Sequence, residues 1–278
     1  MAHNRRVSKR QIWLAVVLLS PFAAISLLPL YWMMVSAFKP SAAILNLPPD
    51  WLPEQVTLDN FVTLLQSARV LRWTANSLVV ASLVAVGNIV FDTMAGYAFA
   101  RRHSRWHPWL FWMIMAGMMI PEQITMIPLF LMMVNWGWYN HLAALVVPTL
   151  ATPFGIFLMK QFIESLPEEL EAAARIDGAS EWHVFWRVIF PLSRPAWAMV
   201  GLFHFVGNWN RFLWPLIMTH SDDMRTLPVG LATLQSQYSI DFGLLMAGAA
   251  VTALPMILLF FAMQKSFYGG LTAGSLKT

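Results

Sequence analysis

The chain is 278 residues long, with 58% hydrophobic residues, only 12% charged residues and a formal net charge of +4. Soluble domains average about 25% charged residues, so this composition excludes an ordinary soluble domain and indicates a membrane protein. The sequence has no cysteine, which excludes disulfides and thiolate metal sites. Its basic residues lie between the apolar segments rather than on one amphipathic face, so we expect no binding of nucleic acid.

Six apolar segments are long enough to cross a bilayer as helices. They cover residues 12–38, 73–100, 108–134, 141–159, 196–219 and 242–264. These segments predict an all-α membrane protein with six transmembrane helices, built as a single transmembrane domain over residues 1–278. The first segment is too long for the core of a signal peptide and no small-residue cleavage site follows it, so we expect it to be retained.

The basic residues are distributed unequally between the two sides of this predicted topology. With a cytoplasmic N-terminus, the cytoplasmic side holds most of them, namely Arg5, Arg6, Lys9, Arg10, Arg101, Arg102, Arg105, Lys160, Arg175, Arg187, Arg194, Lys265 and Lys277. The opposite side holds Lys39, Arg69, Arg72 and Arg225. The positive-inside rule therefore predicts that both termini and the connection between the fourth and fifth segments are cytoplasmic.

The connection of residues 39–72 starts with prolines that favour extended and turn structure. Apolar residues then recur at helical spacing from Leu58 to Leu65, which predicts a short helix capped by Thr57 or Asp59. We expect this helix to lie along the membrane surface.

The connection of about residues 164–195 is the most charged long segment of the chain. Residues 165–168, Ser-Leu-Pro-Glu, fit a capping box, and acidic residues and three alanines follow as the first turns of a helix. Gly178 is expected to end this helix in the left-handed conformation. Ser180 is placed to cap a second helix, which Pro191 and Pro195 are expected to end.

This second helix has one apolar stripe, formed by Trp182, Phe185, Trp186 and Ile189. An amphipathic connector that lies on lipid headgroups explains the stripe. A rigid helix–turn–helix element that docks on a partner explains it equally well, and the residue pattern leaves both interpretations open.

The same segment resembles the EAA signature of ATP-binding-cassette (ABC) importer permeases, which is written EAA, three residues, Gly, nine residues, Ile-x-Leu-Pro. Counted from Gly178, the glutamate position holds Ala172, and Glu171 lies one residue earlier, so Glu171 or Glu169 could supply the charge from a shifted position. Counted forward, Val188, Phe190 and Pro191 take the last positions. The stretches AARIDGAS, FPLS, WNRFLWPL and GLTAGSLKT also resemble carbohydrate importer permeases of the maltose and glycerol-phosphate type.

The resemblance implies the architecture of a type I ABC importer permease, with a cytoplasmic coupling-helix loop, in the inner membrane of a bacterium. It implies a second homologous permease subunit, two copies of a cytoplasmic ABC ATPase and an extracytoplasmic solute-binding protein as partners, besides membrane lipid. The residues that it assigns to ATPase coupling are Glu168, Glu169, Glu171, Ala172, Ala173, Ala174, Asp177, Gly178, Ala179 and Pro191. The implied solute is a sugar or a sugar-like molecule, such as an oligosaccharide, a glycosyl-glycerol, a glycerol phosphodiester or a sulfosugar.

The sequence lacks the motifs of an ATPase. Gly269 and Gly274 have the separation of a P-loop, but Lys277 comes two positions late. There is no zinc-protease motif and no nucleophile elbow, so we expect no enzyme activity and no cofactor or metal in this chain. ATP and Mg²⁺ are expected on the partner ATPase subunits.

Ionisable residues inside a membrane usually line a path or pair with each other. The predicted spans contain Asp92, Glu122 and Arg211. The candidate residues for a substrate pathway are Glu122, Gln123, His204, Asn208, Trp209, Asn210, Arg211 and Trp214, since amides and indoles suit sugar hydroxyls and sugar C–H faces. The alternative is that Arg211 forms a structural ion pair with Glu122 or Asp92, and we expect Asn76 and Asn88 to form interhelical hydrogen bonds.

Three other interpretations stay open at this point. They are an ABC permease for a non-carbohydrate solute, an ion-coupled secondary carrier and a membrane-embedded enzyme. Binding to an ATPase would separate the ABC permeases from the other two.

Overall fold

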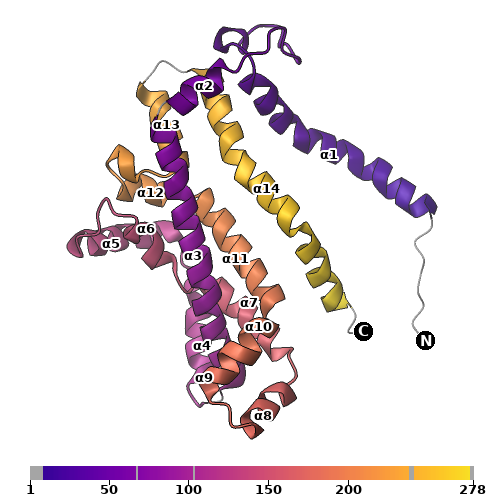
Figure 1. The fold of residues 1–278 in the computed structure, drawn as a ribbon, viewed down its shortest axis with the longest axis vertical. Coiled ribbons are helices and arrows are strands. Elements are labelled where there is room, and N and C mark those ends of the chain that lie inside the picture. Colours follow the sequence, from indigo (N-terminus) through magenta and orange to yellow (C-terminus); the bar gives the residue numbers. More distant parts are fainter. Residues whose placement is uncertain (1–8, 67, 103, 238–240, 276–278) are drawn as a thin grey trace. The chain divides into compact units, whose positions relative to one another are not determined.

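The computed structural model describes residues 9–66, 68–102, 104–237 and 241–275 (Figure 1). All regular secondary structure in these ranges is helical, which confirms the predicted all-α class. The chain divides into two compact units, one of residues Met1–Ala68 with Thr233–Pro255 and one of Arg69–Ala232 with Met256–Thr278.

The first unit contains α1 (Lys9–Ala37), the short turn η1 (Ser41–Ala43), α2 (Asp59–Gln66) and the first part of α14 (Phe242–Ser275). Apolar side chains are exposed all along α1, as expected of a helix that meets lipid or another subunit. The predicted short helix is confirmed as α2, and Thr57 Oγ1 accepts a hydrogen bond from the Asp59 amide at 3.1 Å. The amide of Asn60 donates to the carbonyls of Ala37 and Lys39 at 2.9 and 2.7 Å, which holds α2 against the end of α1.

In the second unit, α3 (Ala68–Arg101) packs against α7 (Pro153–Glu164) and α11 (Arg194–Trp209). Glycines allow the close approach. A Cβ atom on Gly96 would lie 2.7 Å from Met159 Cβ of α7, and one on Gly201 of α11 would lie 2.7 Å from Ile89 Cδ1 of α3. Small residues at helix contacts of this kind are typical of membrane proteins.

Three helices in the described ranges are long and apolar enough to cross a membrane: Trp13–Ala37, Arg69–Arg101 and Phe242–Ala262. Two further stretches qualify as bent pairs, so the described ranges hold up to five spans by length and composition. The predicted spans 108–134 and 141–159 thus each contain a bend, and the total of six spans stays a prediction.

The first bent pair joins α4 (His107–Ala116) and η2 (Gly117–Met119) to α5 (Glu122–Asn135) at an angle of 100°. The extended backbone of Pro121 (ψ 134°) and its missing N–H explain the break. The second pair joins α6 (Ala143–Val146) and η3 (Val147–Thr149) to α7 at 44°, across an extended Leu150 (ψ 148°) and Thr152 (ψ 145°). The predicted segment 196–219 is likewise divided at residues 210–212 into α11 and α12 (Leu213–Met218).

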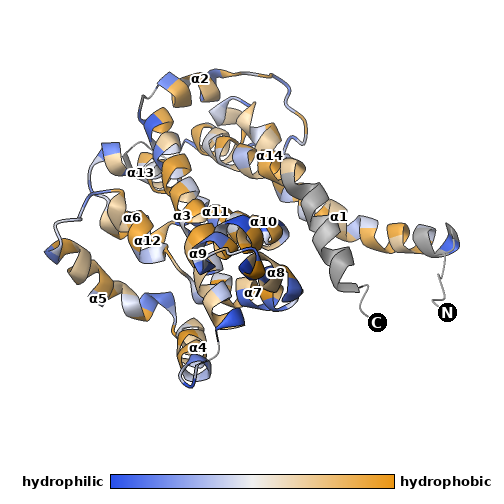
Figure 2. Cartoon of the chain, turned by 60° about the horizontal axis from the view of Figure 1, so that its bottom comes forward, coloured by the Kyte–Doolittle hydropathy of each residue, from blue (hydrophilic) through white to orange (hydrophobic). Residues whose placement is uncertain are grey.

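The segment between α7 and α11 forms α8 (Glu169–Ile176), α9 (Glu181–Val184), the π-helical turn η4 (Phe185–Ile189) and α10 (Phe190–Leu192). Gly178 has φ +82°, which confirms the left-handed end of the first helix. Ser180 caps α9 by accepting a hydrogen bond from the His183 amide at 3.3 Å, as predicted. Figure 2 shows that hydrophilic residues are more frequent on α8 and α9 than on α12.

Two details of the segment differ from the prediction. Ser165 ends α7, because its amide and hydroxyl both donate back to the Phe162 carbonyl, so α8 starts at Glu169 without a capping box. Pro191 does not end the second helix. It lies in α10, which continues α9 and η4 without a break, and Pro195 lies in the first turn of α11, a position that tolerates proline.

The remaining elements of the second unit are the turn η5 (Asp222–Met224) and α13 (Leu227–Gln237), whose last residues belong to the first unit. The second unit has two apolar cores. One lies beneath α9 and contains Tyr97, Met159, Ile163, Phe185 and Val200. The other joins α3, α5, α6 and α12 through Val84, Met133, Leu145, Trp214 and Met218.

Candidate functional site

The first part of the site is a set of charged residues beneath α8. The acidic residues of the first turn and the alanines after them favour a helix, and Leu166, Ala174 and Ala179 pack onto the core that contains Phe185. This packing turns Glu171 inward, so that its side chain is only 2% exposed.

Glu171 forms an ion pair with Arg101, the last residue of α3. Arg101 Nε lies 2.6 Å from Glu171 Oε1, and Arg101 Nη2 donates to the Leu166 carbonyl at 2.7 Å. The other carboxylate oxygen of Glu171 accepts from Arg175 Nη2 at 3.1 Å and from the Tyr97 hydroxyl at 3.2 Å. The buried charge is thus compensated on both oxygens, which a stable buried ion pair requires.

Glu181 at the start of α9 extends this arrangement to the second short helix. It accepts hydrogen bonds from Arg175 Nε at 2.9 Å and from the Tyr97 hydroxyl at 3.3 Å, and it forms an ion pair with Arg102 Nη2 at 2.9 Å. The hydrogen bond from Arg175 holds the pKa of the Glu181 carboxyl below its usual value, against a smaller opposing effect of burial. We call Tyr97, Arg101, Arg102, Glu171, Arg175 and Glu181 the Glu171 cluster.

The outward edge of α8 is mainly apolar. Ile176 is 85% exposed and Leu170 43% exposed, and Ala172 and Ala173 are exposed beside them. The glutamate position of the EAA signature thus holds an exposed alanine. The carboxylate of Glu171 is paired inside the protein, whereas Glu168, Glu169 and Asp177 are exposed.

Sequence reasoning did not assign a role in the site to Tyr97, Arg101, Arg102 or Glu181. Arg101 and Arg102 served only to orient the chain. Both lie at the end of an apolar span, on the side of the membrane where the acidic segment is also predicted. This shared side is the sequence signal that could have indicated the pairing.

The second part of the site lies at two helix breaks. Arg211 lies between α11 and α12, and its guanidinium forms an ion pair with Glu122 in the first turn of α5. The Arg211 side chain is 23% exposed and that of Glu122 54% exposed. The predicted Arg211–Glu122 ion pair is therefore present and accessible, and its role, structural or in a pathway, stays a prediction.

Asp92 on α3 is fully buried and pairs with His204 on α11. Its Oδ1 accepts from the Thr152 amide at 2.9 Å, and its Oδ2 lies 3.4 Å from His204 Nε2. The Thr152 hydroxyl is 3.1 Å from the same ring nitrogen. These contacts join α3, the start of α7 and α11.

The other predicted pathway residues have different surroundings. Trp209 and Trp214 are buried, and the Trp214 indole donates to the Ala144 carbonyl at 2.9 Å. Asn208 and Asn210 donate to carbonyls one turn back in their own helix, and Gln123 is exposed beside Glu122. A pathway role for all these residues stays a prediction.

Asn76 and Asn88, which were predicted to form interhelical hydrogen bonds, each donate to a carbonyl of another segment. Asn88 donates to the Thr149 carbonyl at 2.9 Å, which confirms the expected bond between helices. Asn76 donates to the carbonyls of Asp223 and Arg225 at 2.7 and 2.9 Å, so its partner is a loop and not a helix.

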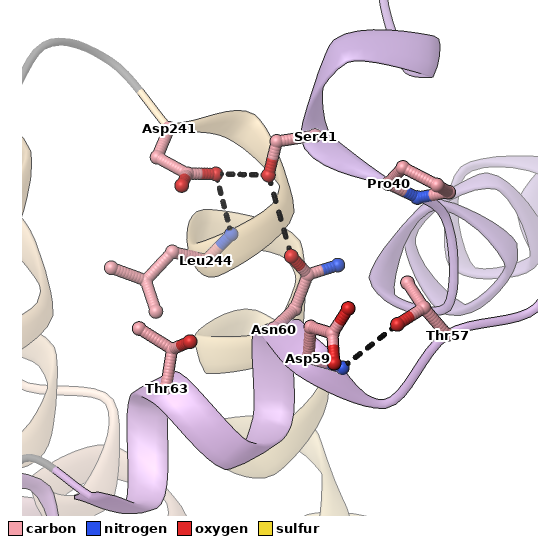
Figure 3. A pocket seen from close by; sticks show the side chains of 8 residues that line it. All are labelled: Pro40, Ser41, Thr57, Asp59, Asn60, Thr63, Asp241 and Leu244. Carbon is pink, nitrogen blue, oxygen red and sulfur yellow. Dashed lines mark hydrogen bonds between the residues drawn. The ribbon is translucent and has the colours of Figure 1, made fainter.

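The first unit has a polar pocket of about 270 Å³, lined by Pro40, Ser41, Thr57, Asp59, Asn60, Thr63, Asp241 and Leu244 (Figure 3). Asp241 accepts from the Ser41 hydroxyl and from the amides of Gly243 and Leu244. Burial tends to raise the pKa of Asp241, but these hydrogen bonds outweigh it and leave the pKa below its usual value. Asp241 thereby caps α14. Among the described residues, no group of three or more His, Cys, Asp and Glu residues could hold a metal ion.

The sequence matches the profile of the family described as "binding-protein-dependent transport system inner membrane component" over residues 92–269. The arabinooligosaccharides transport system permease protein AraQ of Halalkalibacterium halodurans is 36% identical over 226 residues, which cover 81% of each chain. The lactose transport system permease protein LacG of Rhizobium radiobacter is 35% identical over 202 residues, or 73% of this chain and 74% of the relative.

The fold is also similar to a solved structure of a bacterial ABC transporter involved in the import of the acidic polysaccharide alginate. The TM-score is 0.81 at 22% identity, and the match covers 95% of this chain and 99% of the other. The same fold, with a TM-score of 0.68 at 17% identity, occurs in a bacterial alginate ABC transporter in complex with alginate pentasaccharide-bound periplasmic protein. That match covers 92% of this chain and 95% of the other.

Proposed function

The chain belongs to the family of binding-protein-dependent transport system inner membrane components, and from this premise we propose that it is the permease subunit of an ATP-driven importer of oligosaccharides or similar sugars. Relatives that are more than 30% identical include proteins named as arabinooligosaccharide and lactose permeases, which supports the carbohydrate class. Since the family consists of transport components, the chain is not an enzyme. We place ATP and Mg²⁺ on partner ATPase subunits.

The observation that carries this proposal is the geometry of α8, Gly178 and α9. Two short helices fixed at a left-handed glycine corner, with their charges paired internally, form a rigid projection. We propose that α8 docks in a groove of a cytoplasmic ABC ATPase. In this orientation both termini of the chain are cytoplasmic.

The exposed edge of α8 defines the chemistry of this contact. Ile176 and Leu170 are exposed, and Ala172 replaces the glutamate that the signature would place there. Exposed apolar side chains of this size gain free energy when a partner covers them. We therefore propose that the ATPase contact at this position is mainly apolar.

We place the solute path at the Arg211–Glu122 pair. Charged groups in a membrane face protein or water rather than lipid, and both side chains of this pair are partly exposed. Gln123 and Asn210 add exposed amides next to them. Amides and a compensated ion pair suit the hydroxyl groups of a sugar. A second homologous permease subunit would complete the path from the other side.

In operation, a loaded solute-binding protein would dock on the extracytoplasmic face and ATP would close a pair of ATPase subunits. The movement of α8 would then turn the path from one side of the membrane to the other. Alternating access of this kind requires only that the ligand and ATP each favour a different state of the same complex.

The test is a tagged purification after co-expression with the neighbouring genes, with stoichiometry read by native mass spectrometry. We expect one copy of this chain, one homologous permease and two ATPase copies. ATP hydrolysis stimulated by the loaded binding protein is then screened over neutral oligosaccharides, amino acids and metal ions. Stable purification of this chain without an ATPase, or stimulation by a non-carbohydrate solute alone, would overturn the proposal.

A further inference from the structure

α3 connects the Glu171 cluster to a loop at its opposite end. At one end, Arg101 and Tyr97 hold Glu171. At the other end, α3 contacts residues 222–227, which contain η5 and the start of α13. The two contact regions are parts of the same compact unit.

The contacts at this second end are mainly hydrogen bonds to the backbone of the loop, besides an ion pair of Arg69 with the Asp222 side chain at 3.2 Å. The Trp73 indole donates to the Asp222 carbonyl at 2.7 Å, and Asn76 donates to the carbonyls of Asp223 and Arg225. The Leu227 amide donates to the Ser77 hydroxyl at 2.8 Å. Backbone bonds of this kind fix where the loop lies, whichever side chains it carries.

Between these contacts α3 is one uninterrupted helix of 34 residues. At a rise of 1.5 Å per residue, Asn76 and Arg101 are about 38 Å apart along its axis. The neighbouring elements contain joints that α3 lacks: Pro121 between η2 and α5, residues 150–152 before α7, Gly178 after α8 and residues 210–212 after α11.

The middle of α3 is tightly packed, so it has little room to bend. A Cβ atom on Gly155 of α7 would lie 1.7 Å from Asp92 Oδ2, and one on Gly87 of α3 would lie 2.4 Å from Leu150 Cδ2. Packed interiors move as bodies instead of deforming continuously. A displacement of one end of α3 is therefore passed to the other end.

We propose that α3 is a rigid connection between the coupling segment and the loop of residues 219–226, with Arg101 and Asn76 as the positioning residues at its two ends. The inference rests on the proposed function, because it makes α3 the route by which ATPase closure and docking of the binding protein influence each other. Linkage requires this influence to act equally in both directions on the binding equilibria.

The first experiment measures amide hydrogen exchange in the loop of residues 219–226 in the purified complex, in wild type and in Arg101→Gln. Coupling between sites typically changes affinities by at least about fivefold, so we expect loop exchange to rise by about that factor. The matched control is Arg102→Gln, because Arg102 is the next residue, its side chain is 52% exposed and, among the described contacts, it pairs with Glu181 and not with the buried Glu171. We expect no change of loop exchange in this control.

Arg101→Lys separates charge from geometry. Lysine keeps the charge opposite Glu171 but cannot also donate to the Leu166 carbonyl as the guanidinium does. We expect its loop exchange to lie between wild type and Arg101→Gln. Unchanged loop exchange in Arg101→Gln would overturn the proposal, since the cluster would then act only on its surroundings.

The second experiment starts from the other end. Asn76→Asp keeps the side-chain size but turns a donor toward two carbonyls into an acceptor, while Asn135→Asp, at the exposed end of α5, is the control. We expect Asn76→Asp to raise exchange in the α8–α9 segment by about fivefold and to reduce stimulation of ATP hydrolysis by the binding protein. Basal hydrolysis stays as in wild type.

The outcomes separate the two proposals. A chain that binds no ATPase contradicts the proposed function, yet exchange in the purified chain still decides whether α3 connects its two ends. If Arg101→Gln fails to fold, Asn76→Asp gives the answer through the α8–α9 segment. Loss of ATPase stimulation without any change of exchange at the distant end would overturn the rigid connection.

Discussion

The Glu171 cluster and the Arg211–Glu122 pair both place opposite charges side by side, but they differ in burial and in the number of partners. Glu171 is buried and has partners on α3 and on α8, whereas Glu122 is half exposed and, among the described residues, its carboxylate pairs with Arg211 alone. A buried charge with several partners does not readily give up any of them, because the loss of one partner leaves a charge uncompensated. An exposed pair can exchange one partner for a solute hydroxyl at low cost. The Glu171 cluster is thus suited to hold a fixed geometry, and we expect the Arg211–Glu122 pair to be the one that opens.

The largest effect is expected from the glycine corner. Gly178→Val places a β-branched residue at φ +82°, a conformation that such residues avoid, and we expect coupled transport to be abolished although the protein still inserts. Uptake in vesicles and membrane yield are measured together. Gly207→Ala, at a helical glycine with open space around it, is the control. Normal ATP-dependent uptake by Gly178→Val would remove the coupling role of this corner.

Loss of the Glu171 carboxylate is expected to destabilise the Glu171 cluster as a whole. Glu171→Ala leaves the buried Arg101 without its nearest and only buried carboxylate among the described residues, and removal of one member of a buried pair typically costs about 3–5 kcal/mol of stability. Thermal unfolding of the purified complex measures this effect. Glu169→Gln changes an exposed residue and should stay within about 0.5 kcal/mol of wild type. Equal stability of the two variants would contradict the difference between buried and exposed acidic residues.

A smaller effect is expected at the outward edge of α8. Ile176→Asp places a charge where we propose an apolar contact, and the loss of one buried large side chain of about 1.5–3 kcal/mol corresponds to at least about tenfold weaker ATPase binding. Co-purification and affinity of the ATPase are measured, with Ile176→Leu as the conservative control. Unchanged binding of Ile176→Asp would show that the partner does not cover this edge.

The exposed pair is expected to affect transport more than folding. Glu122→Gln removes a partner worth about 0–1 kcal/mol of stability, typical of accessible pairs, so the unfolding temperature should hardly change. We expect the apparent affinity for the solute to change by about tenfold if Arg211 contacts it directly. Solute-dependent ATP hydrolysis gives this affinity. A large loss of stability with unchanged solute affinity would make the pair a structural element like the Glu171 cluster.

The smallest effect is expected when the pH is lowered. The pKa of Glu181 is lower in the folded protein than in the unfolded chain, because Arg175 donates to it. The contribution of Glu181 is therefore present above its usual pKa and is lost as the pH falls through the lowered pKa. The protection of the α8–α9 amides, which is their exchange relative to the intrinsic rate at each pH, should fall over this acid range in wild type. Glu181→Gln should lack this pH dependence. A wild-type pH curve that matches the curve of Glu181→Gln would rule out the contribution of Glu181.

The sequence predicted the helical class, the left-handed turn at Gly178 and the Ser180 cap, because these depend on local chemistry. Hydropathy did not predict how far the chain bends within residues 108–134 and 141–159, since it measures length and composition but not direction. The inward turn of Glu171 also escaped prediction. Its partner Arg101 lies 70 residues earlier, and no periodicity within either segment joins the two. The pairing of Glu122 with Arg211 was anticipated only as an alternative, because few ionisable residues occur in the spans.

The right-angled bend between η2 and α5 has a consequence for the order of biosynthesis. Residues 108–134 contain Glu122 as their single charged residue, so insertion machinery that selects segments by hydropathy accepts them as one span. The ion pair at the bend, however, requires Arg211, which is synthesised 89 residues later. The bend itself follows from Pro121, whereas the ion pair across it forms only after Arg211 has been made, so truncation of the chain before Arg211 leaves Glu122 without this partner.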